Sequence, residues 1–447
     1  MTLGNFLWAS EQLLLGQRAS DGQMPDVVFA AGGSRAGFNR CSDQACTFPP
    51  GSPLPRPACC GNSSTDGAAA AGGSEPRADD TAVHPRNCND GSMDSAPFAV
   101  FNVIFLAEQL KASTGGPEAA GSWLGRWLPS LLRGLARVPG GPAASAFGSL
   151  AYNDPDDPIV GYGFEDSVAK TGALNYASLL IIEASALLCQ VVRNLAASNA
   201  TVAAHRPETE ALCRRATKMS AELTPALWDD ATGTFHPSTG LEGNLTDVWG
   251  SAYAASLDGV HTILGPSGVH TPRWPSDVPS PTTPAQRERI AAFLADPKNG
   301  VFANGQVRHL PIGQGWVQEW CVPKGATEPP GAKIAPPCAE GWLYSKPGDY
   351  QSAGSGPPPS TNNHHIWPLL HSVPATRSVA CGLLRDFVSG ATNNSLGPLS
   401  LLDINEWVDG KGVPRGARGY VASAANAAAA ARTMKANGGC ADQQHKS

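Results

Sequence analysis

The chain has 447 residues, of which 42% are hydrophobic and 16% charged, a composition that supports a large folded core and excludes a broadly disordered protein. The formal net charge of −6 argues against nucleic acid as a partner, because phosphate binding depends on Lys and Arg. No apolar run reaches the roughly 18 residues that a membrane-spanning helix needs, so we expect no membrane span.

Helical segments follow one another along most of the chain. Apolar residues recur with the period of a helix, as Leu3, Phe6 and Leu7 do in the first segment. We expect helices over residues 3–16, 95–112, 120–137, 167–197, 204–228, 246–260, 284–296, 363–390 and 419–436. Residues 298–362 are rich in Gly and Pro and are expected to be mostly irregular. Because alternating β-branched residues are scarce, the predicted fold class is all-α, in a single domain over residues 1–447.

Residues 48–82 differ from the rest of the chain because Gly, Ala, Ser and Pro dominate them, leaving few side chains for a core. We expect a poorly ordered surface insertion there. Five of the eleven cysteines crowd between residues 41 and 88, without the paired Cys-x2-Cys units of a zinc site. A loop stapled by disulfides is the expected arrangement.

Four Asn-x-Ser/Thr sequences, at Asn62, Asn199, Asn244 and Asn393, favour a secretory or extracellular protein. The Cys-rich stretch fits the same compartment, because disulfides persist in oxidising environments. The first residues, Met1-Thr2-Leu3-Gly4, lack the basic region and the cleavage site of a signal peptide.

Two acidic sequences precede predicted helices in the first half of the chain. Asp94 stands before Ser95-Ala96-Pro97, where Asp is a favourable N-cap and Pro a favourable first-turn residue. Further on, Gly163-Phe164-Glu165-Asp166-Ser167 opens the helix expected over 167–197. Two interpretations are open for this sequence. In the first, Asp166 or Ser167 is an ordinary N-cap and Glu165 is exposed to solvent. In the second, Glu165 or Asp166 is a general acid, and we favour Asp166 for this role. Since a helix N-terminus favours the ionised carboxylate, an acid at this place needs burial or a second carboxylate to raise its pKa.

A third acidic sequence lies near the end of the chain. Ile404-Asn405-Glu406-Trp407-Val408-Asp409-Gly410 places a carboxylate beside an aromatic ring, and a Gly-rich turn leads from it to Gly419-Tyr420 and a helix. As an alternative to a catalytic role, we expect Glu406 either to act as a cap or to form an ion pair with Arg415 or Arg418. Two carboxylates brought together by the fold are what glycoside hydrolysis requires, one as the acid and one as the base.

These segments resemble those of the inverting glycosidases built on an (α/α)6 toroid, the trehalases, processing α-glucosidases and mannosylglycerate hydrolase-like enzymes. Gly163-Phe164-Glu165-Asp166 is similar to the Gly-aromatic-Asp motif of trehalases and the Gly-Leu-Asp-Asp motif of processing glucosidases. Glu406-Trp407 with its Gly-rich turn resembles the Glu-Gln-Tyr-Asp segment of processing glucosidases. The resemblance implies a toroid in which Asp166 is the acid and Glu406 the base.

Further residues are expected to line the same cleft. The start of the 95–112 helix resembles the Pro-containing helix start of the same enzymes, and His364-His365-Ile366-Trp367-Pro368 resembles the Trp-Pro helix start before their base segment. The expected substrate-binding residues are Asp94, Phe164, Glu165, Asp247, Trp249, Arg308, His309, Tyr350, Gln351, Trp367 and Trp407. No metal or other cofactor is expected, because adjacent His364 and His365 point apart on a helix and no carboxylate follows them at a ligand's spacing.

The N-terminal region departs from the family pattern. Asn5-Phe6-Leu7 through Pro25-Asp26 resembles the helix and turn that normally follow a first helix containing Trp-Asp. The resemblance therefore implies a toroid that lacks its first helix.

The function implied by the resemblance is hydrolysis of an α-glucosidic or α-mannosidic bond in an oligosaccharide or small glycoside, with inversion. Two alternatives stay open at the level of sequence. One is a polysaccharide lyase or unsaturated-glycan hydrolase on the same fold, where a lyase would rest on a Tyr/His pair. The other is a non-catalytic carbohydrate-binding or scaffold protein.

Overall fold

Helices make up most of the residues that the computed structural model describes, in agreement with the predicted all-α class. The described residues are 27–31, 35–39, 95–112, 115–138, 140–141, 147–155, 170–240, 242–257, 274–303, 306–314, 350–351, 362–393, 407–408, 414–415 and 421–440. The helix predicted over 3–16, the insertion predicted over 48–82 and the Cys-rich stretch lie outside them.

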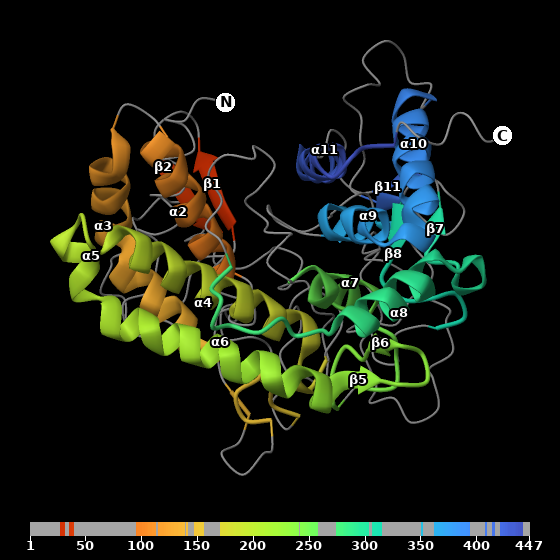
Figure 1. The fold of residues 1–447 in the computed structure, drawn as a ribbon, viewed down its shortest axis with the longest axis horizontal. Coiled ribbons are helices and arrows are strands. Elements are labelled where there is room, and N and C mark those ends of the chain that lie inside the picture. Colours follow the sequence, from red (N-terminus) through yellow and green to blue (C-terminus); the bar gives the residue numbers. More distant parts are fainter. Residues whose placement is uncertain are drawn as a thin grey trace, which may run out of the picture.

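The helices follow the predicted order along the chain (Figure 1). They are α2 (Ser95–Ala112), α3 (Gly116–Arg137), α4 (Asn175–Leu195), α5 (Ala200–Ala204), α6 (Arg206–Leu227), α7 (Val248–Ser256), α8 (Pro284–Ala295), α9 (Asn362–Ser372), α10 (Arg377–Asn393) and α11 (Val421–Ala436), with 3-10 turns η1 (Pro297–Asn299) and η2 (Pro374–Thr376). The bounds predicted for α2 are confirmed, and those predicted for α8 differ by one residue. A capping box fixes the start of α8, since the Thr283 side chain accepts from the Gln286 amide while the Gln286 side chain accepts from the Thr283 amide.

The start of α4 differs from the prediction. The helix begins at Asn175 instead of residue 167, with Leu174 as its N-cap, so neither Asp166 nor Ser167 caps it. A short strand, β4 (Gly172–Ala173), comes directly before it and pairs with β3 (Tyr152–Asn153). Gly172 has a φ of +79°, a left-handed conformation that ends any helical path at this point.

The helical stretch predicted over 363–390 consists of two helices, α9 and α10. Val373 adopts an extended conformation before Pro374, because the proline ring disfavours a helical residue in front of it. The 3-10 turn η2 then redirects the chain into α10.

The core is formed by helices that pack in pairs, and α4 and α7 are buried along almost all of their length. α2 packs on α3 and α4, and α4 packs along α6, which lies beside it in Figure 1. α4 also contacts α7, and α7 in turn packs on α8 and α9, while α9 contacts α10 and α11. Of the described helices, α4 alone is long and apolar enough to cross a membrane, but 94% of the window concerned is buried inside the protein.

Among the described residues, other short antiparallel strands form two local hairpins and one sheet, and the sheet joins parts of the chain that are far apart in sequence. Hairpins are formed by β1 (Val27–Ala31) with β2 (Arg35–Asn39) and by β5 (Trp228–Asp229) with β6 (Thr234–Phe235). A five-stranded sheet has the order β11-β10-β9-β8-β7 and consists of β7 (Phe302–Ala303), β8 (Gln306–Arg308), β9 (Tyr350–Gln351), β10 (Trp407–Val408) and β11 (Pro414–Arg415). The prediction that residues 298–362 are mostly irregular therefore missed the three strands β7, β8 and β9.

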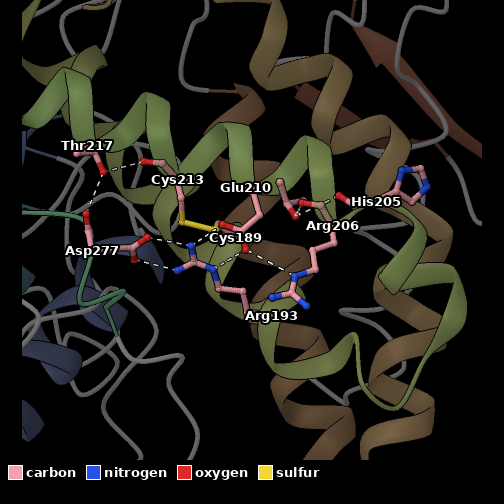
Figure 2. A network of polar contacts seen from close by, with 9 residues as sticks. Cys189, Arg193, His205, Arg206, Glu210, Cys213, Thr217 and Asp277 are labelled. Atoms are coloured by element: carbon pink, nitrogen blue, oxygen red, sulfur yellow. Dashed lines mark hydrogen bonds and ion pairs between the residues drawn. A yellow bond between two sulfur atoms is a disulfide. The ribbon is translucent and has the colours of Figure 1, made fainter.

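A covalent and ionic connection fixes α4 to α6 and to the segment before α8 (Figure 2). Cys189 of α4 and Cys213 of α6 form a buried disulfide. One turn away, the Arg193 guanidinium donates to Glu210 on α6 and, through both terminal nitrogens at 2.9 Å, to Asp277. A planar guanidinium can hold two carboxylates at once, and this geometry closes the three segments around the end of α4.

Candidate active site

Four of the predicted substrate-binding residues come together where α7 begins and β8 ends. Asp247 is the N-cap of α7, and Trp249 lies in its first turn. The Val248 amide donates to the His309 carbonyl at 3.1 Å, which joins α7 to the residues after β8. The rings of Trp249 and His309 meet edge to face, with centroids 4.0 Å apart. We call Asp247, Trp249, Arg308 and His309, with Lys170 and Asn175, the polar cluster.

Asp247 is the centre of the polar cluster and is fully buried. Its Oδ1 accepts from the Gly250 amide at 2.7 Å, as an N-cap carboxylate should, and its Oδ2 accepts from Asn175 Nδ2 at 2.9 Å. Burial raises the pKa of Asp247 to about 6, although these two hydrogen bonds and the charges of Lys170 and His309 oppose the rise. Asp247 thus titrates near neutrality, which is typical of groups at functional sites.

Lys170 and Asn175 belong to the cluster although the sequence did not single them out. Both are buried, and Asn175 is the first residue of α4. The Lys170 carbonyl accepts from the Asn153 side chain, which anchors the segment to β3. The sequence feature that could have indicated them is their position on either side of Thr171-Gly172-Ala173-Leu174, shortly after Glu165-Asp166.

The five-stranded sheet aligns other predicted residues with Arg308. Tyr350 of β9 is paired with Arg308 of β8, and Gln351 is paired with Val307. On its other side, Gln351 is paired with Trp407 of β10. Residues that are far apart in sequence, Arg308, Tyr350, Gln351 and Trp407, therefore occupy adjacent positions of one sheet.

Trp367 lies in α9, which packs on α7. Its side chain is fully buried in α9 and meets Phe387 of α10 edge to face, with ring centroids 5.5 Å apart. This position gives the ring a packing role between two helices, and its predicted contact with a sugar stays a prediction.

Five predicted site residues lie outside the described residues. They are the proposed acid Asp166, the proposed base Glu406, and Asp94, Phe164 and Glu165. It also stays a prediction that Glu406 pairs with an arginine. The same holds for the expectation that His364 and His365 bind no metal.

A buried pair of polar side chains supports the polar cluster from within the core. The Tyr253 hydroxyl of α7 donates to the Glu183 carboxylate of α4. Burial, and next the charge of Glu183, raise the pKa of Tyr253 well above its usual value. The pair joins the same two helices that hold Asn175 and Asp247, and its sequence signal was a single carboxylate inside the apolar run from Leu179 to Leu188.

Comparison of the chain with known protein families and with curated proteins finds no match.

Proposed function

We propose that the protein is an inverting glycoside hydrolase of the (α/α)6-toroid class, with Asp166 as the general acid and Glu406 as the general base. Its substrate is an oligosaccharide or a small glycoside with an α-glucosidic or α-mannosidic bond. The paired packing of successive helices supports this class of fold.

The main support is that the two segments carrying the proposed carboxylates lead to the same part of the protein. Asp166 precedes Lys170 by four residues, and Lys170 interacts electrostatically with Asp247. Glu406 directly precedes Trp407, whose strand is joined through β9 to the strand of Arg308. The residue after Arg308, His309, contacts both Val248 and Trp249.

Covalent geometry limits how far each carboxylate can be from this place. Four residues of extended chain span at most about 14 Å, and neighbouring strands lie about 4.8 Å apart. An inverting enzyme needs its two carboxyl groups about 6.5–9.5 Å apart, with a water between the base and the sugar. Both segments therefore start within reach of such an arrangement.

In this proposal the polar cluster holds the substrate while the two carboxylates perform the reaction. Lys170, Arg308 and His309 carry donor groups at the wall of the proposed site, and the buried Asp247, held by Gly250 and Asn175, keeps them in place from within the core. The acid protonates the leaving oxygen, and the base removes a proton from the attacking water.

The test is the Glu406→Gln variant on a panel of α-glucosides and α-mannosides, because glutamine keeps the shape of the side chain and removes the base. We expect turnover to fall by about 100- to 10,000-fold with sugar binding retained. The matched control is Glu288→Gln on the exposed face of α8, which should leave turnover unchanged.

Full turnover in Glu406→Gln would contradict the proposal. Sugar binding by the wild-type protein without turnover would favour the non-catalytic alternative. Release of a product with a new unsaturated end would favour a lyase.

A further inference from the structure

A histidine lies beside a disulfide where three helices of the C-terminal region meet. The disulfide joins Cys381 of α10 to Cys440, which follows α11. His371 lies in the last turn of α9. One of its ring nitrogens and the two sulfur atoms of the disulfide all lie within 4.8 Å of one another. His371 is almost completely buried, and Cys381 is buried as well.

The hydrogen bond of His371 determines which ring nitrogen can bind a metal. Its Nε2 lies 2.9 Å from the Gly439 carbonyl, which can only accept, so Nε2 carries the proton. Nδ1 then has a lone pair, and this buried atom has no hydrogen-bond partner among the residues that the structure describes. Metal-bound imidazoles show the same pattern, since one nitrogen donates to a carbonyl while the other binds the ion.

The end of α11 holds Gly439 in the required position. Gly438 and Gly439 have φ angles of +102° and +65°, and the Gly439 amide donates to the Met434 carbonyl at 2.9 Å. Left-handed glycines that end a helix in this way turn the next carbonyl away from the helix axis. The backbone that orients His371 is therefore fixed by the helix terminus.

We propose that reduction of the Cys381–Cys440 disulfide creates a zinc site formed by the two cysteine thiolates and His371 Nδ1. A phosphine or a dithiol supplies the two electrons: with a phosphine, the S–S bond breaks, two thiols form, and the phosphine and one water become the phosphine oxide. Zinc then displaces the two thiol protons, and three protein ligands leave one position for water. Zn–S bonds of about 2.3 Å and Zn–N bonds of about 2.0 Å can form once reduction lets the two sulfur atoms, which lie within 4.8 Å of a ring nitrogen of His371, move apart.

The zinc ion would replace the disulfide as the connection between α10 and the end of α11. Within the described residues, the second disulfide, Cys189–Cys213, offers no equivalent site. Glu210 lies close to Cys189 and Cys213, but its carboxylate is already held by Arg193. The pair Cys189 and Cys213 therefore provides an internal control.

The experiment measures zinc bound per chain on the full-length protein, before and after reduction with a phosphine and removal of excess metal. Cobalt(II) serves as a spectroscopic substitute, because thiolate ligation and tetrahedral geometry give it distinct absorption bands. We expect the reduced wild-type chain to bind one more zinc ion than the reduced Cys381→Ser/Cys440→Ser variant. His371→Gln should weaken this site by at least about 10-fold.

The control variant Cys189→Ser/Cys213→Ser should keep the additional zinc ion. Equal zinc content in the reduced wild type and in Cys381→Ser/Cys440→Ser would overturn the proposal, and so would an unchanged affinity in His371→Gln. Circular dichroism reports whether each variant folds. If His371→Gln does not fold, the zinc content of the reduced wild type against that of reduced Cys381→Ser/Cys440→Ser decides whether the site exists.

Discussion

Asp247 is the residue on which the local arrangement of the polar cluster depends. It ends the loop before α7, caps that helix and binds the first residue of α4. A carboxylate in this place loses its hydration, and its two hydrogen bonds only partly compensate. The position therefore lowers the stability of the folded protein at neutral pH while it organises the cluster.

The Asp247→Asn variant should remove a pH dependence of stability. The pKa of Asp247 is about 6 in the folded protein against an ordinary value of 3.8. As pH rises through this interval the unfolded chain loses the proton first, so the free energy of unfolding falls, by roughly 3 kcal/mol once both states are ionised. Asparagine has no such titration and still offers an oxygen to the Gly250 amide. Chemical denaturation between pH 4 and pH 7 should show the variant gaining on the wild type as pH rises.

The matched control is Asp296→Asn, because Asp296 is also an N-cap but is exposed, at the start of η1. Its stability relative to wild type should not rise with pH over this interval. A constant difference between Asp247→Asn and wild type would contradict the account of Asp247.

A second variant tests the close approach of the helix backbone to this carboxylate. A Cβ atom on Gly250 would collide with the Asp247 carboxylate and with Asn175 Nδ2. We expect Gly250→Ala to lower the free energy of unfolding by about 1–3 kcal/mol, measured by urea denaturation. Gly382→Ala in α10 is the control, since a Cβ there meets nothing within 4 Å and alanine favours a helix. Equal effects of the two substitutions would show that the Gly250 contact is unimportant.

At this scale the sequence predicted part of the candidate site. Asp247, Trp249, Arg308 and His309 were recognised because charged and aromatic residues stand together in short polar sequences. Lys170 and Asn175 were missed, because their importance comes from the β3–β4 pairing that brings them to Asp247. A local pattern contains no information on that long-range contact.

Among the helices, the accuracy of the prediction depended on local end signals. The starts of α2 and α8 were predicted correctly, and both helices have a local start signal, a Pro in the first turn and, in α8, the Thr283–Gln286 box. The start of α4 was placed too early, since the apolar pattern gave no indication of β4. The five-stranded sheet was missed because strands of two or three residues are too short to show alternation.

The attachment of α4 to its neighbours gives a prediction at the scale of elements. Arg193→Ala removes a guanidinium that binds both Glu210 and Asp277, and it should lower the free energy of unfolding by about 1 kcal/mol, because the site is partly exposed to solvent. Arg206→Ala is the control, as Arg206 is more exposed and approaches Glu210 only at 3.8 Å. The control should change stability by less than about 0.5 kcal/mol. Thermal denaturation at low and high salt measures the stability of both variants. An equal loss of stability in Arg193→Ala and Arg206→Ala would mean that the ion pairs of Arg193 stabilise the protein no more than an ordinary surface pair does.

At the scale of the whole molecule, helix pairs and the small sheet bring distant segments together. α4 links the helices of the first half to α7, and the sheet links residues 302–308 to residues 350–351, 407–408 and 414–415. The helical class was predictable from composition and periodicity. The resemblance to toroid glycosidases also predicts that Asp166 and Glu406 face one cleft, and this stays a prediction.

The proposed inverting mechanism is tested most directly by the configuration of the sugar at the moment of its release. Proton NMR, recorded during hydrolysis of an α-glucoside or α-mannoside, distinguishes the two anomers before they interconvert. The account predicts that the β anomer appears first, because water attacks from the face opposite the leaving group when Glu406 acts as base and Asp166 as acid. Initial release of the α anomer would contradict it, since retention requires a covalent intermediate and carboxyl groups only about 5 Å apart.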